Sequence, residues 1–353
     1  YNSYVILDEK IAVMDTVDAN FTHEWLDNIQ KVLGDRKPDY LVVSHMEPDH
    51  AANIKNFAER YPETKIVGNA KTFAMMGQFF EMDLTERKVL VKEGETLSLG
   101  SHTLQFFMAP MVHWPEVMVT YEQSEKILFS ADGFGKFGAL DAEEEWAEEA
   151  ARYYLNIVGK YGVQVQGLLK KASGLDIRMI CPLHGPILKE NLGYYIDKYQ
   201  TWSTYQPEKH GVMVAYASIH GNTAQAAALL AEQLKALGET VVLLDLSRCD
   251  MAEAVAQAFR FDRTVLAAAS YDGGVFLPME EFLLHLQYKA FQKRTIALVE
   301  NGSWAPCAAK KMHTLLDTMK DLTVLEQTVT IRSAVKPGDE SALLALADAV
   351  HQA

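Results

Sequence analysis

From about His210 to its end, the chain alternates short apolar strands with helices of medium length, and this rhythm strongly constrains its fold. Strands are predicted at Val212–Tyr216, Thr240–Asp245, Thr264–Ala269, Thr295–Val299 and Val329–Ile331. A helix is predicted after each strand, at Thr223–Leu237, Ala252–Phe259, Glu280–Tyr288, Ala308–Met319 and Glu340–His351. Such a series of β-α units predicts an α/β fold with a doubly wound parallel sheet.

The part of the chain before His210 mixes strands and helices less regularly. A hairpin is predicted at Tyr4–Leu7 and Ile11–Met14, and a helix at Phe21–Leu33. Further elements are predicted as strands at Tyr40–Val43, Lys65–Val67, Leu104–Phe107, Val117–Tyr121, Lys126–Phe129 and Met179–Ile180, and as a long helix at Glu143–Lys171. This pattern favours stacked sheets with helices outside them. The polar stretch Trp202–His210 separates the two patterns, so we place one domain at residues 1–205 and another at 210–353.

Length and composition are those of a globular protein, because 353 residues suffice for two domains with separate cores. The net charge of −14 argues against nucleic acids and anionic membranes as partners, since both are polyanions. No apolar run approaches the ~20 residues that span a bilayer. The three cysteines form no C-x-x-C pair and no signal peptide is evident, which indicates a cytoplasmic protein with reduced thiols. The start Tyr-Asn-Ser-Tyr suggests that the natural N-terminus is missing.

A cluster of metal-ligating residue types follows the predicted strand Tyr40–Val43. Its candidate ligands are His45, Glu47, Asp49 and His50. Pro48 lies inside the cluster and predicts a loop rather than a helix. A loop after a strand can direct alternating side chains towards two neighbouring ions, whereas a helix would splay them apart. The competing interpretation is an acidic surface turn with two incidental histidines.

Three further candidate ligands also come just after predicted strands. They are His113, Asp132 and His184, and they lie in Ala109–Pro115, Phe129–Gly133 and Cys181–Pro186. A lone histidine is more often a structural residue than a ligand. Four histidines and three carboxylates placed in this way predict a centre for two metal ions.

Another cluster lies between the strand Val212–Tyr216 and the following helix. Its residues are Ser218, Ile219, His220, Gly221, Asn222 and Thr223. Hydroxyl groups and a glycine at a helix start form an anion site together with backbone N–H groups and the helix dipole. An ordinary helix N-cap would have the same residue types. The loop lacks the G-x-x-x-x-G-K-S/T pattern, which disfavours hydrolysis of nucleoside triphosphates.

Two more loops follow the third and fourth strands of the regular part. They contain Ser270, Tyr271, Asp272, Gly273 and Gly274, and Asn301, Gly302, Ser303, Trp304 and Ala305. In an open parallel sheet, ligands bind beyond the carboxyl ends of the strands where the strand order reverses, so we expect these loops to converge. Tyr271 and Trp304 are candidates to cover a flat ring, although each could be an ordinary surface aromatic.

The pattern H-x-E-x-D-H, followed by His113, Asp132 and His184, resembles that of the flavodiiron proteins, and the loop at 218–223 resembles the phosphate loop of flavodoxins. The resemblance covers essentially the whole chain, with about forty N-terminal residues of the family absent. It implies an N-terminal αββα metallo-β-lactamase-like sandwich, followed by a flavodoxin-like doubly wound parallel sheet. It also implies FMN at the three loops and two iron ions. One iron would take His45, Glu47 and His113, the other Asp49, His50 and His184, with Asp132 bridging them.

The resemblance further implies an oxidoreductase that reduces oxygen to water or nitric oxide to nitrous oxide with electrons relayed by FMN. No catalytic residue beyond the metal ligands is expected. The chain has no rubredoxin-like cysteine pairs, so a separate donor, such as a rubredoxin or a reduced cofactor, would supply electrons. A head-to-tail homodimer, or a dimer of dimers, would bring one subunit's FMN to the other's metals.

Two rival functions remain on sequence grounds. A dinuclear zinc hydrolase of the metallo-β-lactamase type would carry H-x-H-x-D-H, and Glu47 counts against it because mixed carboxylate and imidazole ligands suit iron. A non-enzymatic FMN electron carrier would have an incomplete metal site, yet all seven ligands are present.

Overall fold

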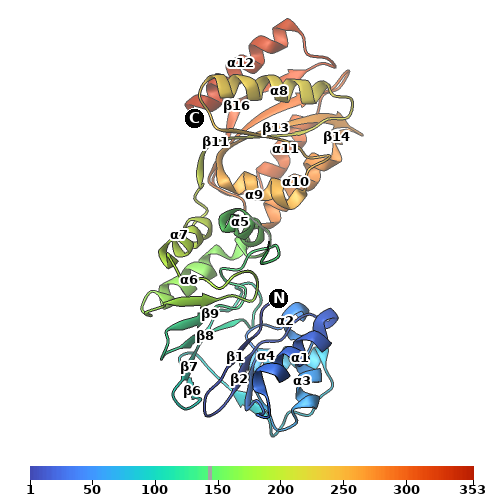
Figure 1. Ribbon diagram of the computed structural model, residues 1–353. Helices are drawn as coiled ribbons and strands as arrows, with labels where there is room; N and C mark the ends of the chain where they lie inside the picture. The colour runs from blue at the N-terminus through green and yellow to red at the C-terminus, as the bar shows by residue number, and fades with distance from the viewer. Residues whose placement is uncertain (142–144) are drawn as a thin grey trace. The chain divides into compact units, whose positions relative to one another are not determined.

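The computed structural model describes residues 1–141 and 145–353 (Figure 1). The chain forms two compact units, one of residues 1–153 and 163–200, the other of residues 154–162 and 201–353. The sequence-based domain limits, 1–205 and 210–353, stay a prediction. Among the described residues, no helix combines the length and the apolar character needed to cross a membrane.

The first unit contains two five-stranded sheets. One has the order β1-β2-β3-β4-β5, from the strands Tyr4–Ile6, Ala12–Met14, Tyr40–Val42, Lys65–Gly68 and Lys88–Leu90. The other has the order β10-β9-β8-β7-β6, from Met179–Cys181, Ile127–Phe129, Met118–Glu122, Thr103–Met108 and Thr96–Ser98. The predicted hairpin is present as the antiparallel pair β1 and β2.

Alternate residues of the strands face opposite layers, as the strand geometry requires. Ala12 and Met14 belong to a core cluster shared with Phe106 and Met118 of the other sheet. Ile11 and Val13 belong to a different cluster, which contains helix residues of the first half of the chain. The first sheet is therefore covered by the second sheet on one face and by helices on the other, which is an αββα sandwich.

The helices of this part are α1 (Thr22–Leu33), α2 (Pro48–Ala51), α3 (Ile54–Arg60), α4 (Ala70–Phe79), α5 (Trp146–Ile157), α6 (Gly162–Ala172) and α7 (Leu192–Ser203). Two 3-10 turns, η1 and η2, cover Ala19–Phe21 and Gly159–Tyr161. The long helix expected at Glu143–Lys171 is wrong as a single element, because the turn η2 interrupts it between α5 and α6. Its expected start at Glu143 lies outside the described residues.

The loop prediction around Pro48 is also wrong. A four-residue helix, α2, begins at Pro48. Proline is favoured at the first helical position, because its missing N–H would have no partner in the helix there. Asp49 and His50 therefore lie on a helical turn, whereas His45 precedes it.

The second unit has a parallel sheet with the order β12-β11-β13-β15-β16, and a short strand β14 pairs with β13. The strands are Val241–Asp245 (β12), Lys209–Ala217 (β11), Phe261–Tyr271 (β13), Gly274–Val275 (β14), Arg294–Asn301 (β15) and Leu322–Ile331 (β16). The helices are α8 (Asn222–Ala236), α9 (Met251–Arg260), α10 (Leu277–Tyr288), α11 (Ala308–Leu316) and α12 (Pro337–Gln352). The predicted doubly wound sheet is confirmed, because α8 and α12 lie on one face and α9, α10 and α11 on the other (Figure 1).

The order of the strands places a switch point between β11 and β13, because the chain continues from β11 to β12 on one side and later returns to β13 on the other. The core on the α8 side is made of small and branched side chains such as Val214, Ala227 and Ala267. Because Ala227 is small, α8 can lie close to the sheet. This close packing positions the first turn of α8 near the ends of the strands.

Candidate functional site

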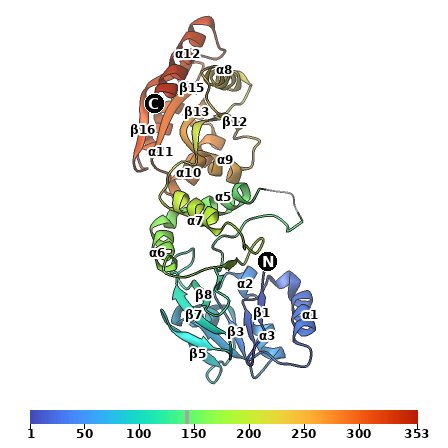
Figure 2. The same cartoon turned by 60° about the vertical axis from the view of Figure 1, so that its left-hand side comes forward.

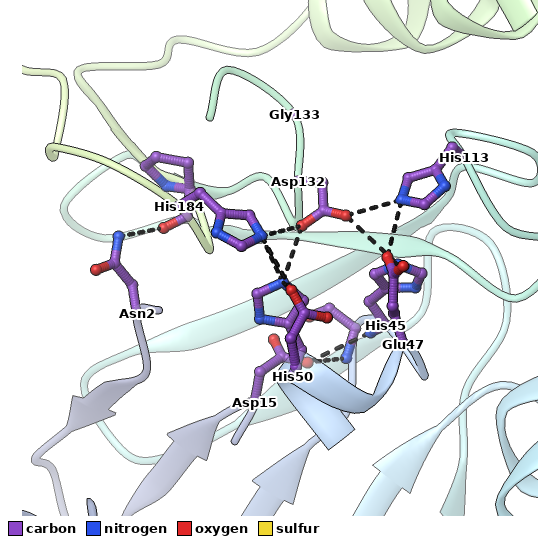
Figure 3. Close-up of polar contacts among 12 residues, drawn as sticks. Asn2, Asp15, His45, Glu47, His50, His113, Asp132, Gly133 and His184 are labelled. Carbon is purple, nitrogen blue, oxygen red and sulfur yellow. Dashed lines mark hydrogen bonds and ion pairs between the residues drawn. The ribbon is translucent and has the colours of Figure 1, made fainter. Parts of the chain in front are cut away.

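The structure brings the predicted metal ligands of the first unit together at one edge of the sandwich (Figure 3). His45 follows β3, His113 follows β7, Asp132 follows β9 and His184 follows β10. These residues form two groups whose ligand atoms lie within 4.8 Å of one another: His45, Glu47, His113 and Asp132, and then Asp49, His50 and His184. The ends of strands from both sheets therefore supply one shared cluster.

In the first group, the imidazoles of His45 and His113 converge on the carboxylate of Glu47. The Oε2 atom of Glu47 lies 3.2 Å from Nε2 of His45 and 3.1 Å from Nε2 of His113. Oδ2 of Asp132 lies 3.4 Å from Nε2 of His45 and 3.1 Å from Nε2 of His113. Two imidazoles and two carboxylates thus direct one atom each to a common point.

The second group has the same arrangement around the other oxygen of Asp132. Oδ1 of Asp132 lies 3.1 Å from Nε2 of His50 and 3.7 Å from Nε2 of His184. Oδ2 of Asp49 lies 3.3 Å from each of these two nitrogen atoms. The two nitrogen atoms are 2.9 Å apart. Asp132 therefore presents one oxygen to each group, which is the geometry of a bridging carboxylate.

Two buried carboxylates that sequence reasoning missed hold the first group in place. Oε1 of Glu116 lies 2.8 Å from Nδ1 of His45 and accepts a hydrogen bond from the backbone N–H of Met46. Oδ1 of Asp15 accepts hydrogen bonds from the backbone N–H groups of Ser44 and His45. An acceptor at Nδ1 keeps Nε2 free to bind a metal. Neither residue belongs to a motif. The only signal was that Asp15 follows a strand, as the ligands do.

The loop that carries His184 is held by the beginning of the chain. The Asn2 side chain donates to the carbonyl oxygens of Pro182 and Gly185, and the Asn2 backbone N–H donates to Leu183 (Figure 3). The Tyr153 ring lies 5.6 Å from the His184 ring, measured between centroids. The second group is therefore positioned by packing and backbone contacts, whereas the first uses buried carboxylates.

The charged groups of the cluster shift one another's pKa values, because they lie close together and several of them are buried. Burial would lower the pKa of His45, but Asp132, Glu116 and Glu47 outweigh it and raise that pKa to about 10. Burial would raise the pKa of Asp132, yet His45, His113 and His50 hold it well below its usual range. Hydrogen bonds from His113 and His45 lower the pKa of Glu47 to about 2. The carboxylates are thus ionised at neutral pH, as metal ligands must be.

The donor set fits two hard or borderline metal ions. Imidazole and carboxylate ligands together suit iron better than an all-imidazole set does. The buried Oδ1 atom of Asp49 has no hydrogen-bond partner among the described residues, which is costly unless a cation or water lies beside it. Both groups of residues are therefore suited to hold a metal ion.

The three loops of the second unit line one pocket of about 460 Å³ at the carboxyl ends of β11, β13 and β15. The predicted residues that line it are Ser218, Ile219, His220, Asn222, Thr223, Ser270, Tyr271, Asp272, Gly273, Asn301, Gly302, Ser303, Trp304 and Ala305. The structure does not bring Gly221 and Gly274 to the pocket wall. Gly221 has φ +91° and begins α8, so it shapes the phosphate-type loop through its backbone.

Hydrogen bonds connect the loops that line the pocket. The hydroxyl of Ser270 accepts hydrogen bonds from the backbone N–H groups of Cys307 and Ala308, at the start of α11. Asn301 exchanges hydrogen bonds with the backbone of Ser333, and the hydroxyl groups of Ser333 and Ser303 lie 2.9 Å apart. Ser333, Cys307 and Ala269 also line the pocket and were missed. Ser333 follows β16, and the position after a strand end was the signal that could have found it.

The two aromatic residues of the pocket are open to solvent. The Trp304 side chain is 89% exposed and Tyr271 is 46% exposed. The Tyr271 ring contacts Phe276 at 5.7 Å, edge to face, and this contact orients it. A flat ring could enter between them with one edge near the backbone of the loops.

Comparisons with known proteins agree with this arrangement. Residues 1–185 match a family described as "ODP family beta lactamase". The chain is 32% identical over 289 residues to the rubredoxin-oxygen oxidoreductase of Megalodesulfovibrio gigas. The aligned region covers 78% of this chain and 71% of that protein. It is 29% identical to the anaerobic nitric oxide reductase flavorubredoxin of Vibrio vulnificus, over 90% of this chain and 66% of that protein.

A solved structure is also similar over the full length of the chain. It is rubredoxin oxygen:oxidoreductase from Desulfovibrio gigas, with a TM-score of 0.92 and 27% identity, covering 100% of this chain and 90% of that chain. Some curated relatives are much longer, because the match covers only 45% of diflavin flavoprotein A 1 of Synechocystis. The chain corresponds to only part of those proteins.

Proposed function

Since the chain belongs to the flavodiiron protein family, we propose that it is an oxidoreductase that reduces oxygen to water, nitric oxide to nitrous oxide, or both. The observation that carries this proposal is the pair of ligand groups that share Asp132. Two metal ions held by these residues would supply Lewis-acid and redox chemistry for the reduction of a small gas molecule. The rubredoxin-oxygen oxidoreductase and the flavorubredoxin named above are relatives with these two activities.

The metal centre is proposed to hold two irons. His45, Glu47 and His113 would bind one, and Asp49, His50 and His184 the other, with Asp132 between them. Iron supplies one-electron chemistry at each ion when bound. The protein's own part is to keep Nε2 of His45 directed inwards through Glu116, and to keep the carboxylates ionised.

The second pocket is proposed to hold FMN, which would relay electrons to the metals. Ser218, Asn222 and Thr223 would hold its phosphate at the start of α8, where backbone N–H groups and the helix dipole favour an anion. Tyr271 and Trp304 would flank the isoalloxazine ring. Gly221, although outside the pocket wall, would allow the left-handed turn that starts the helix.

Electrons are proposed to come from a separate donor, a rubredoxin or a reduced cofactor, as the names of the two relatives suggest. A head-to-tail homodimer, or a dimer of dimers, would place one subunit's FMN near the other's metals. The cytoplasmic location and the lack of nucleic acid and membrane partners stay predictions.

The test of the reaction begins with metal analysis and a visible spectrum of the purified protein. We expect about two irons and about one FMN per chain. Anaerobic reduction followed by exposure to each gas separately then measures the two rates. A protein that carries zinc and hydrolyses esters or lactams, or that carries FMN with an empty metal centre, would contradict the proposal and support one of the two rivals.

A mixed dimer tests the route of the electrons. A flavin-domain variant such as Thr223→Ala, provided that it loses FMN, and the metal-centre variant His113→Ala should each be inactive alone. After subunit exchange, we expect up to about a quarter of wild-type activity, since half of the dimers are mixed and each has one working site of two. No recovery after demonstrated exchange would reject the head-to-tail arrangement.

A further inference from the structure

A second cavity of the first unit, about 300 Å³ in volume, lies between the outer face of the sheet β6–β10 and the helices α6 and α7. Figure 2 shows these two helices beside that sheet. Phe107, Val119 and Leu128 line it from the strands, and Val165, Leu168 and Ile196 from the helices. Phe107 and Val119 are sequence neighbours of Phe106 and Met118 in the sandwich core, so they point to the opposite face of the sheet.

The polar side chains that line this cavity already have partners. Ser130 donates to the carbonyl oxygen of Gly133, and Ser173 to that of Lys170. The Lys171 ammonium group donates to Glu93 and to the carbonyl oxygen of Met108. The Tyr199 hydroxyl accepts a hydrogen bond from the backbone N–H of Phe134. A water molecule needs two to four polar partners to be stable in a cavity, and these mostly apolar walls offer it few.

The cavity also adjoins the metal centre. Gly133 and Phe134 line it and directly follow Asp132 in the chain, and Val112 lines it and directly precedes His113. Figure 3 shows Gly133 next to Asp132. The hydroxyl of Tyr199, which also lines the cavity, is hydrogen-bonded to the backbone of Phe134, two residues after Asp132. Two of the loops that carry ligands to the metal centre therefore also line the cavity.

We propose that this cavity is an apolar binding site for small uncharged gas molecules, from which oxygen or nitric oxide reaches the metal centre. Such molecules form at most weak hydrogen bonds and partition from water into apolar surroundings, whereas ions and ordinary metabolites do not. Apolar cavities of roughly half this volume are known to stay dry and to take up xenon or benzene. The identity of the gas rests on the proposed function, but the binding of an inert gas does not.

Xenon is the direct probe, and it needs no activity. The wild-type protein in its purified form is examined by xenon NMR titration and by diffraction from crystals pressurised with xenon. We expect xenon density in contact with Val165 and Phe107, and a saturable shift in solution. Ordered water in place of xenon, or xenon at other positions only, would overturn the proposal.

Two variants with the same substitution then separate filling of the cavity from a general effect on the helix. Val165 on α6 is buried and lines the cavity, whereas Val163 on the same helix is 76% exposed and does not. Val165→Phe should abolish xenon binding and raise the KM for the gas several-fold with kcat unchanged, because it obstructs supply and not chemistry. Val163→Phe should change neither. If Val165→Phe does not fold, Ala172→Leu at the end of the same helix fills the same space.

The outcomes distinguish this inference from the proposed function. Xenon bound in the wild type, with neither gas reduced, would contradict the proposed function and support the binding site. If the protein reduces a gas but binds no xenon in the cavity, the proposed function is supported and the binding site is contradicted. If Val165→Phe abolishes xenon binding but leaves the KM for the gas unchanged, the proposal that gas reaches the metal centre through this cavity is wrong.

Discussion

The metal centre and the flavin pocket are built by opposite means. The ligands at the metal centre are charged or ionisable side chains, of which His45, His50, His113 and Asp132 are buried. The flavin pocket is lined by backbone, hydroxyl and amide groups, and its largest side chain, Trp304, is 89% exposed. One site is complete before anything binds, whereas the other is a set of loop ends that a ligand would have to complete.

The difference follows from what each site must hold. A metal ion needs several charged donors fixed at short distances, so Glu116 holds the His45 ring and Asp15 holds the backbone that carries it. A phosphate and a flat ring can be held by N–H groups of a helix start and by ring contacts, which need fewer charges. A single side chain should therefore matter much more in the first site than in the second.

The largest effect is expected for Asp132→Ala. This change removes an oxygen from each ligand group and the shared negative charge between them, so both ions should be lost. Elemental analysis should show iron falling from about two per chain towards none, with activity at background. His113→Ala is the matched control, because it touches only one group and should spare the other ion. Full iron occupancy in Asp132→Ala would show that it does not bridge.

A smaller effect is expected for Glu116→Gln. Glutamine can still accept the hydrogen bond from His45, but it lacks the charge that makes the imidazole a better donor to metal. Loss of such a supporting contact typically weakens metal binding about ten- to a hundredfold, and competition with a chelator measures it. Glu122→Gln is the control, because Glu122 is also buried but, within the described part of the chain, accepts hydrogen bonds from the backbone of Ser124 and Glu125 and none from a ligand. Equal losses in both variants would show that Glu116 acts through general stability.

The sequence predicted the ligands better than the residues that support them. His45, Glu47, Asp49 and His50 share one short motif, and the ends of neighbouring strands meet at one edge, so their convergence could be expected. Asp15 and Glu116 are single carboxylates far apart in the chain and belong to no motif. The position of Asp15 after a strand was a weak signal, and Glu116 had none. The turn at Pro48 was missed because proline both breaks helices and begins them.

In the second unit, regular alternation made the fold predictable, because every strand and helix repeats the same unit. The predicted strands lie within β11, β13, β15 and β16, and that at Thr240–Asp245 exceeds β12 by one residue. The short strand β14 was missed because two residues carry no periodicity. Ser333 was missed because the loop after the last strand has no glycine to mark it.

In the flavin pocket, the strongest single effect should come from Thr223→Ala. Thr223 is 2% exposed and lies in the first turn of α8, where its hydroxyl would reach the phosphate. Loss of one hydrogen bond to a charged group costs about 1.5 kcal/mol, which is roughly tenfold in the Kd for FMN. Thr223→Ser keeps the hydroxyl and should bind almost as the wild type does. Iron content should be unchanged in both, and a fall in iron would show that the two sites depend on each other for folding.

The smallest effect is expected for Trp304→Ala. An indole that is 89% exposed has few contacts to hold it in one rotamer, so stacking on the flavin ring would cost conformational entropy that offsets much of the gain. We expect a loss of at most about 0.5 kcal/mol, or roughly twofold in the Kd for FMN measured by fluorescence. Tyr271→Ala should cost more, because the contact of Tyr271 with Phe276 already orients its ring. If Trp304→Ala weakened FMN tenfold instead, the loop at 301–305 would have to close over the ring on binding, and the flavin pocket would resemble the metal centre in its bound state.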